Sequence, residues 1–243
     1  MTAGYDMTIQ SLHLTAPSGS RVRIDLSADA RVSAVAATVR IAGGSFGTGL
    51  QIGPRGQHEF TARHVLPGRQ RERMLVHGRE VVIAEADDQQ ASFASFIGPY
   101  HELLTVYAGP APKRARVFAL FSSLEIRDTA GGMVVRPRPA TLLGILSEFL
   151  VIMVEARGTL TVPGPKQVSA LVPKHAGARV KNGEVWRSTY PGVTAATKAS
   201  DYTYVLACAA GMAEVNLADT VGAVESQQLT WLNDINVAWL AGD

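Results

Sequence analysis

The fold of this chain is decided by residues 74–83, which read MLVHGREVVI. Apolar residues lead into and out of the pair His77-Gly78, and a two-residue loop of this kind is typical of a tight β-hairpin. Residues 178–187 repeat the signal as ARVKNGEVWR, where Asn182-Gly183 is the strongest dipeptide for a type I′ turn. Small or apolar residues alternate with charged ones beside this second turn, as half-exposed strands require. The two segments predict antiparallel hairpins.

Helices are expected beside these hairpins. Residues 142–154 read LLGILSEFLVIMV, with Thr141 in the N-cap position, and their apolar side chains recur at spacings of three and four. This pattern predicts a buried apolar helix over about 141–156. A C-terminal amphipathic helix is predicted from Thr220 to Leu240, and a shorter helix over Lys113–Leu124. The predicted fold class is α+β, with a mainly antiparallel β-sheet built from hairpins.

The length of the chain allows one large domain or two small ones. It has 243 residues, of which 47% are hydrophobic, and this is enough to bury a sizeable core. The segment Arg136-Pro137-Arg138-Pro139 is the best candidate linker. It would separate a β-rich half, residues 1–139, from a half that holds a helix, a hairpin and the C-terminal helix, residues 140–243. One continuous domain is the alternative.

Composition narrows the classes of partner and the expected location. The net charge is +2, which is too small for a nucleic-acid footprint. The apolar run of residues 142–154 is shorter than the roughly 20 residues that cross a bilayer, so no membrane span is expected. The first residues have neither a basic region nor an apolar core, so we expect no signal peptide. The single cysteine, Cys208, allows no internal disulfide, and a cytoplasmic location is predicted.

Catalytic motifs give little support to an enzyme. Residues 43–47 read GGSFG and match G-x-S-x-G, the pattern of a hydrolase nucleophile elbow. An elbow must open directly into a helix, whereas Gly53-Pro54 breaks the chain a few residues later. No Gly-Lys-Ser or Gly-Lys-Thr of a phosphate-binding loop occurs. We therefore predict no catalytic residues and no cofactor.

Histidines are common metal ligands, and the spacing of those in this sequence bears on a metal site. On one continuous strand, His58 and His64 would share a face about 20 Å apart, too far for one ion. A bend would let His58, Glu59, His64 and His77 converge, but no residue pattern requires it. We expect solvent-facing histidines on hairpin strands and no metal site.

A basic stripe borders the first hairpin. One interpretation is a site for an anion or an acidic partner, and the other is a solvated sheet edge whose charges discourage edge-to-edge pairing. The interleaved Glu72 and Glu80 weaken the positive field and favour the second. The stripe consists of Arg63, Arg69, Arg71, Arg73 and Arg79.

The order of elements along residues 58–140 resembles a known family. A hairpin that ends at Glu85 is followed by a strand at Leu103–Tyr107, a helix near 113–124 and the segment GMVVRP at 132–137. This order is similar to the PsbP-type α+β fold, which includes LpqN-like proteins and small secretion chaperones. The resemblance implies a non-catalytic binding or adaptor module, and it carries over no site residues.

Two hypotheses of function follow. The first is a binding, adaptor or scaffold protein that acts through protein–protein contacts, with a protein partner or a homo-oligomer. Its candidate interface is formed by Trp231, Ile235 and Trp239 on the C-terminal helix, and self-association through the apolar helix over 142–154 is the alternative. A subunit that repeats in a large assembly is a further form of this hypothesis.

The second hypothesis is a small-molecule enzyme without a recognisable motif. A lone acid in an apolar helix, such as Glu148, can acquire a raised pKa and act as a base. Its site would be assembled from scattered residues, namely Glu148, Glu155, His101 and Tyr107.

Overall fold

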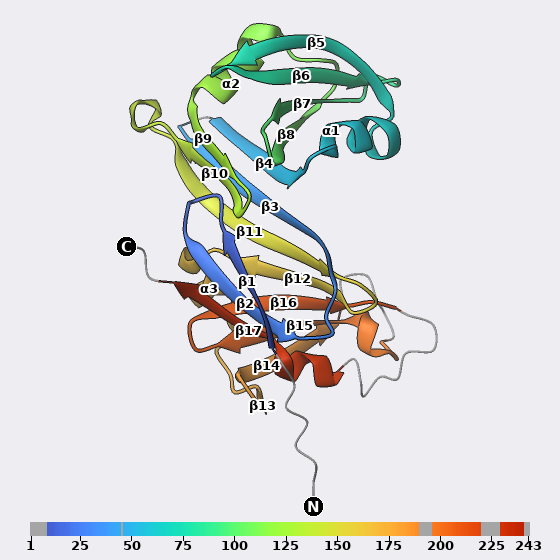
Figure 1. Cartoon of the computed structure of the whole chain (residues 1–243), viewed down its shortest axis with the longest axis vertical. Coiled ribbons are helices and arrows are strands. Elements are labelled where there is room, and N and C mark those ends of the chain that lie inside the picture. The colour runs from blue at the N-terminus through green and yellow to red at the C-terminus, as the bar shows by residue number, and fades with distance from the viewer. Residues whose placement is uncertain (1–8, 45, 190–195, 220–228, 241–243) are drawn as a thin grey trace, which may run out of the picture. The chain divides into compact units, whose positions relative to one another are not determined.

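The computed structural model describes residues 9–44, 46–189, 196–219 and 229–240. Within these ranges, twelve strands join in one hydrogen-bonded order, and smaller sheets have three and two strands (Figure 1). The chain divides into two compact units: unit 2 contains residues 15–19 and 36–148, and unit 1 contains the rest. The candidate linker at 136–139 lies inside unit 2, and a division into N-terminal and C-terminal halves stays a prediction.

Unit 2 is built around a meander of antiparallel strands. The strands are β3 (Val32–Gly43), β4 (Phe46–Pro54), β5 (Gly68–Val76), β6 (Arg79–Ala86), β7 (Ala91–Ile97) and β8 (His101–Ala108). They are paired in the order β3-β4-β8-β7-β6-β5. The hairpin predicted from residues 74–83 is confirmed, because Val76 pairs with Arg79. His77 and Gly78 in its loop have φ angles of 53° and 71°, which a type I′ turn requires.

Different helices cover the two faces of this meander. The helices are α1 (Gln57–Phe60), the π-helical turn η1 (Thr61–Val65) and α2 (Arg114–Ser122). On one face, buried Phe93 and Leu104 pack against Leu66, which follows η1. On the other face, the rings of Phe96 and of Phe121 in α2 lie 6.0 Å apart. The helix predicted over 113–124 is therefore confirmed, and it packs on the sheet through its apolar side.

A separate hairpin completes unit 2. Strands β9 (Leu124–Thr129) and β10 (Gly132–Pro137) pair after α2, and the 3-10 turn η2 (Pro139–Thr141) follows. Residues 15–19 also belong to this unit. The Thr15 N–H donates to the Gly131 carbonyl at 2.9 Å, and the Val135 N–H donates to the Pro17 carbonyl at 2.8 Å.

Unit 1 is also mostly antiparallel sheet, in the order β13-β14-β15-β16-β12-β11. These strands are β11 (Gly144–Val154, of which residues 149–154 belong to unit 1), β12 (Gly158–Pro163), β13 (Ala178–Val180), β14 (Gly183–Thr189), β15 (Tyr202–Cys208) and β16 (Gly211–Leu217). Helical segments are α3 (Pro165–Leu171), η3 (Ala199–Asp201) and η4 (Leu232–Asp234). A second sheet contains β1 (Ile9–Thr15), β2 (Arg21–Ser27) and β17 (Asn236–Leu240). Leu160 and Val215, opposite each other on β12 and β16, are fully buried in the core.

The predicted α+β class is wrong, because the described chain is mostly antiparallel β-sheet and its helices are few and short. The predicted buried helix over 141–156 is also wrong, because residues 144–154 form strand β11. Burial along β11 alternates, with Glu148, Leu150, Ile152 and Val154 buried and the residues between them more exposed. A run that is apolar all round has no clear period, so spacing alone cannot separate a helix from a buried strand. Its β-branched residues favour the strand. None of the helices within the described ranges combines the length and hydropathy of a bilayer span.

The predicted C-terminal helix over 220–240 is also wrong in the part that the structure describes. Residues 236–240 form β17, which pairs antiparallel with β2, and η4 precedes it. Residues 220–228 lie outside the described residues. The apolar residues at the end of this segment belong to a strand. Its hydrogen-bonding partner is residues 21–25, more than 200 positions away in the sequence. Periodicity in a local window does not detect such pairing.

The second predicted turn is displaced by one residue. Val180 pairs with Gly183, so Lys181 and Asn182 form the loop and Gly183 begins β14. Gly183 has a φ of +155°, and a Cβ there would lie 1.9 Å from the Ala207 carbonyl oxygen. A side chain at this position would clash with the backbone of β15, so the close approach of β14 and β15 requires a glycine here.

The alternation of β11 gives the first prediction. Replacement of buried Ile152 by alanine should lower the free energy of unfolding by about 3 kcal/mol, because it leaves a cavity. Met153→Ala, one position along and 48% exposed, should change it by less than about 0.5 kcal/mol. Urea unfolding of both variants measures this contrast. Equal losses would contradict the period-two burial of a strand.

Candidate functional site

A pocket of about 670 Å³ opens in unit 2 between β4, β8 and α2. The ladder between β4 and β8 covers only Gln51–Pro54 and His101–Leu104, although β4 begins at Phe46 and β8 continues to Ala108. In the described chain these end segments have no ladder pair with each other. Each is paired on its other side, β4 with β3 and β8 with β7. The pocket therefore lies between two open strand edges.

The wall of this pocket is largely apolar. Ala119 and Leu120 of α2 and Leu143 contribute to it, together with Phe46 and Val106 from the two strands. Phe46 and Val106 are 39% and 46% exposed. Large apolar side chains that stay exposed at the wall of a cavity of this size are typical of binding sites.

Two polar side chains of the pocket lack conventional partners. The guanidinium carbon of Arg116 lies 5.4 Å from the ring centroid of Tyr107, in cation–π contact. The Tyr107 hydroxyl is buried and has no hydrogen-bond partner among the described residues. Burial raises the pKa of Tyr107 to about 12, although the charge of Arg116 opposes this. At neutral pH both groups are therefore hydrogen-bond donors.

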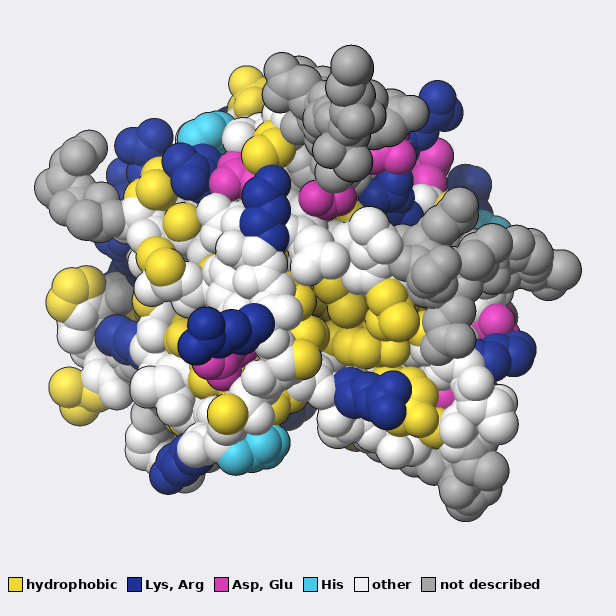
Figure 2. Space-filling view, turned by 90° about the horizontal axis from the view of Figure 1, so that it is seen from below, with side chains coloured by type: hydrophobic (Ala, Val, Ile, Leu, Met, Phe, Trp, Pro, Cys, Tyr) yellow, Lys and Arg dark blue, Asp and Glu magenta, His cyan; other side chains and the backbone are white. Residues whose placement is uncertain are grey.

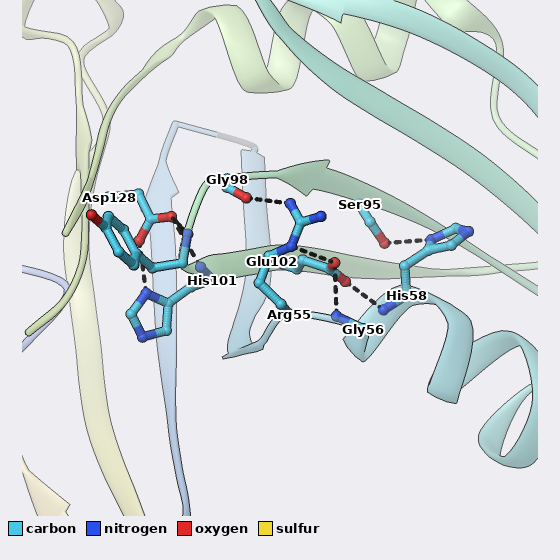
Figure 3. Close-up of polar contacts among 9 residues, drawn as sticks. Arg55, Gly56, His58, Ser95, Gly98, His101, Glu102 and Asp128 are labelled. Atoms are coloured by element: carbon cyan, nitrogen blue, oxygen red, sulfur yellow. Dashed lines mark hydrogen bonds and ion pairs between the residues drawn. The ribbon is translucent and has the colours of Figure 1, made fainter. Parts of the chain in front are cut away.

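The other notable polar cluster of unit 2 has a structural role (Figure 3). Glu102 of β8 is 2% exposed and accepts the backbone N–H groups of Gly56 and His58 at 2.9 and 2.6 Å. Helix α1 has no side-chain cap of its own, so Glu102 satisfies its first donors from a neighbouring strand. The Arg55 guanidinium, 4.0 Å from Glu102, donates to the Gly98 carbonyl at 2.6 Å.

Asp128 has a similar role at the β7–β8 turn. It accepts the backbone N–H groups of Tyr100 and His101 at 2.8 and 2.9 Å, and its other oxygen lies 2.7 Å from Nδ1 of His101. A Cβ at Gly98 would lie 2.4 Å from the Asp128 carboxylate, so the turn needs a glycine there. The carboxylates of Glu102 and Asp128 are thus used by the fold.

The sequence predicted that His58 would face solvent on a strand, and this prediction is wrong because His58 is buried. It lies on α1, where Nδ1 is 2.9 Å from the Ser95 hydroxyl and the ring packs 5.1 Å from that of Phe93. Burial lowers the pKa of His58. His64 is exposed on η1, and His77 is in the first hairpin turn. Within the described ranges, no three side chains of metal-binding type come together.

The basic stripe is largely ion-paired. On edge strand β5, Arg69 lies 3.4 Å from Asp87, Arg73 lies 2.9 Å from Glu80, and Arg71 contacts Glu85. The remaining members are Arg63 on η1 and Arg79 at the start of β6. The structure thus brings three of the five together, each with a carboxylate. Recruitment of an anion by this stripe stays a prediction.

The candidate interface residues lie in unit 1. Trp231 and Ile235 are buried, at 3% and 0% exposure, and Trp239 pairs with Val22 across β17 and β2. Trp231 ends a described helical turn, whereas Ile235 and Trp239 lie beyond it, so no continuous helix presents all three side chains. An interface at these residues stays a prediction, and it would require the buried pair to leave the core.

The residues of the enzyme hypothesis are distributed over separate sites. Glu148 accepts the Ser18 N–H at 2.7 Å, and His101 is bonded to Asp128. Glu155 lies in the turn after β11, where its N–H donates to the Arg31 carbonyl. Tyr107 is the member of the set that lines the pocket.

The glycine-rich segment at 43–47 is a hairpin connection and not a strand-to-helix elbow, because Gly43 on β3 pairs with Phe46 on β4. Ser45 lies outside the described residues. Gly47 and Gly49 line the pocket, which the sequence analysis missed. Two glycines in alternate positions of a strand are a signal of close backbone approach. Arg116 had no such signal, since it is one basic residue on a helix.

Unit 1 offers a weaker candidate. Its pocket of about 160 Å³ is lined by residues that include Asp25, Asn182 and Asp234, and Asp25 is already bonded to Ser11 and Asn236. Figure 2 shows apolar side chains gathered in a recess on one face of the molecule. We therefore assign the candidate site to the pocket of unit 2.

No family model, curated protein or solved structure matches the chain. The resemblance of residues 58–140 to the PsbP-type fold stays a prediction. The pocket itself is therefore the feature of this chain that bears on its function.

The role of Glu102 can be tested by stability. Glu102→Ala should lower the free energy of unfolding by about 3 kcal/mol, because two buried N–H groups lose a charged acceptor. Glu125→Ala is the control, since its carboxylate is 49% exposed beside Arg127, and should change stability by less than about 0.5 kcal/mol. Urea unfolding gives both values. A loss in Glu102→Ala no larger than in the control would contradict the anchoring role.

His58 predicts a dependence of stability on pH. Its folded pKa lies below the unfolded value of 6.5, so the unfolded chain binds more protons as pH falls below 6.5. Stability should then decrease by up to about 1.4 kcal/mol per pH unit until the folded pKa is reached. The lowered pKa of Glu85, due first to the Ala111 N–H, acts only below about pH 4.5.

Chemical denaturation between pH 5 and pH 7.5 measures this effect. In His58→Gln the slope in this range should be smaller than in the unmodified protein. His64 is exposed and provides the matched control, so His64→Gln should keep the slope. An unchanged slope in His58→Gln would assign the pH dependence to other groups.

Proposed function

We propose that this chain is a non-catalytic binding protein, of adaptor or scaffold type, that captures a protein partner through the pocket between β4, β8 and α2. The observation that carries the proposal is the pocket itself, about 670 Å³ in volume and lying between two open strand edges. Exposed Phe46 and Val106 at its wall add apolar contact area. These features suit a ligand with both a backbone and an apolar side chain.

The placement of three carboxylates of unit 2 also supports binding over catalysis. Glu102 and Asp128 accept backbone N–H groups, and Glu85 accepts the Ala111 N–H and contacts Arg71. Each carboxylate is thus engaged in holding a turn or a helix. A general base needs an acceptor free to take a proton from a substrate.

The enzyme alternative would have to use Tyr107, which is the one candidate catalytic residue at the pocket. Its pKa of about 12 keeps the phenol protonated at neutral pH, so it is a poor base or nucleophile. Such a group is suited to donating a hydrogen bond to a bound ligand.

Filling the pocket tests the proposal. Ala119 is exposed on α2 and lines the pocket, so Ala119→Trp should occupy the cavity with less than about 1 kcal/mol of change in stability. Ala115, exposed one helical turn earlier, does not line the pocket and provides the control, Ala115→Trp.

Tagged full-length proteins are used to purify complexes from the native cell extract, with light scattering and mass spectrometry of the eluate. We expect a stoichiometric partner with the unmodified protein and with Ala115→Trp, and at least a tenfold loss of it with Ala119→Trp. Equal recovery with both variants would contradict the assignment of the pocket. A bound small molecule that is turned over would favour the enzyme alternative.

A further inference from the structure

We infer that the ligand of this pocket is an extended peptide segment that presents a carboxylate next to an apolar side chain. The inference rests on the proposed function and specifies the chemistry of the partner. Three independent features support it: the open backbone edges, the unbalanced charge of the pocket and the unused hydrogen-bond donors.

The backbone edges favour a peptide over a compact small molecule. Gly47 and Gly49 of β4 face the pocket without side chains, and a Cβ at Gly49 would meet nothing within 4 Å. Across the pocket, Val106 and Ala108 of β8 are exposed and have no ladder pair with β4. An extended peptide can bind such an edge through main-chain hydrogen bonds, with its alternate side chains entering the cavity.

The charge of the pocket favours an anion. Among its described lining residues, Arg116 is the one charged side chain at neutral pH, and no carboxylate is present. Arg116 has no ion pair in the described chain, whereas Arg114 on the same helix lies 3.1 Å from Glu72. An arginine that stacks on an aromatic ring keeps its N–H groups available for a carboxylate.

Among the hydroxyl groups of the pocket residues, that of Tyr107 is the one we expect to donate a hydrogen bond to the ligand. Ser123 donates to the Leu120 carbonyl at 2.6 Å, and the hydroxyl of Thr48 lies 3.1 Å from that of Thr105. The Tyr107 hydroxyl, in contrast, has no hydrogen-bond partner in the part of the chain that the structure describes. A buried donor without a partner destabilises the free protein, so a ligand acceptor that reaches it gains affinity. A carboxylate accepts hydrogen bonds only, and it can satisfy both Arg116 and Tyr107.

The test uses two labelled peptide pools and the full-length protein. Each pool has eight-residue peptides with blocked ends, in which valine and threonine alternate around one phenylalanine. The acid pool carries glutamate beside the phenylalanine, and the amide pool carries glutamine there. Fluorescence anisotropy should show about tenfold tighter binding of the acid pool, the usual effect of one charged hydrogen bond.

Variants on α2 assign the preference to the pocket. Arg116→Gln should reduce the ratio of acid to amide affinity to about one, while Arg114→Gln should keep it. Ala119→Glu places a carboxylate one helical turn from Arg116, so it should also abolish the preference. Thermal unfolding confirms that each variant is folded. If either Arg116→Gln or Ala119→Glu does not fold, the other variant still tests the preference.

The mode of binding is tested by amide hydrogen exchange. The acid pool should protect the amides of Gly47, Gly49, Val106 and Ala108 at least tenfold. Phenylacetate, which offers an aromatic group and a carboxylate without a backbone, should bind at least tenfold more weakly. Equal affinity of phenylacetate without this protection would overturn the peptide assignment. Equal binding of the two pools, or binding of neither, would overturn the inference even if Ala119→Trp loses its partner.

Discussion

The short ladder between β4 and β8 is the constraint on which unit 2 depends. It joins the long β3–β4 hairpin to the β8-β7-β6-β5 meander through four residue pairs, from Gln51 opposite Leu104 to Pro54 opposite His101. At this end the strands are pinned, and at the other end they are open. The same connection therefore holds the sheet together and creates the pocket.

Buried carboxylates secure the paired end. Glu102, opposite Gly53 in the ladder, also holds the first turn of α1, and Asp128 holds His101 at the neighbouring position. Hydrogen bonds from backbone N–H groups to a buried carboxylate are among the stronger ones in proteins. At the open end the hydroxyls of Thr48 and Thr105 lie 3.1 Å apart, and glycines stand on both sides of Thr48. Rigidity and accessibility thus lie at opposite ends of the same two strands.

Local signals were sufficient where the chain folds on neighbours in sequence. His77-Gly78 predicted the first hairpin because a two-residue loop needs positive φ angles, and the apolar face of Lys113–Leu124 predicted α2. For residues 142–154 the apolar spacing predicted a helix and was wrong, because a strand between other strands can be apolar on both faces. The pocket was missed because Gly47, Val106 and Arg116 come from three segments, and none has a distinctive pattern.

The sequence by itself determined the hairpin at 74–83, the helix α2 and the antiparallel character of the sheets. These depend on backbone geometry and on periodicity over ten or so residues. Only the tertiary structure decided that residues 144–154 and 236–240 are strands, that Glu102 caps a helix from another element, and that Arg116 and Tyr107 adjoin one cavity. Pairing between distant strands sets these features, and its energy depends on partners that a local window does not contain.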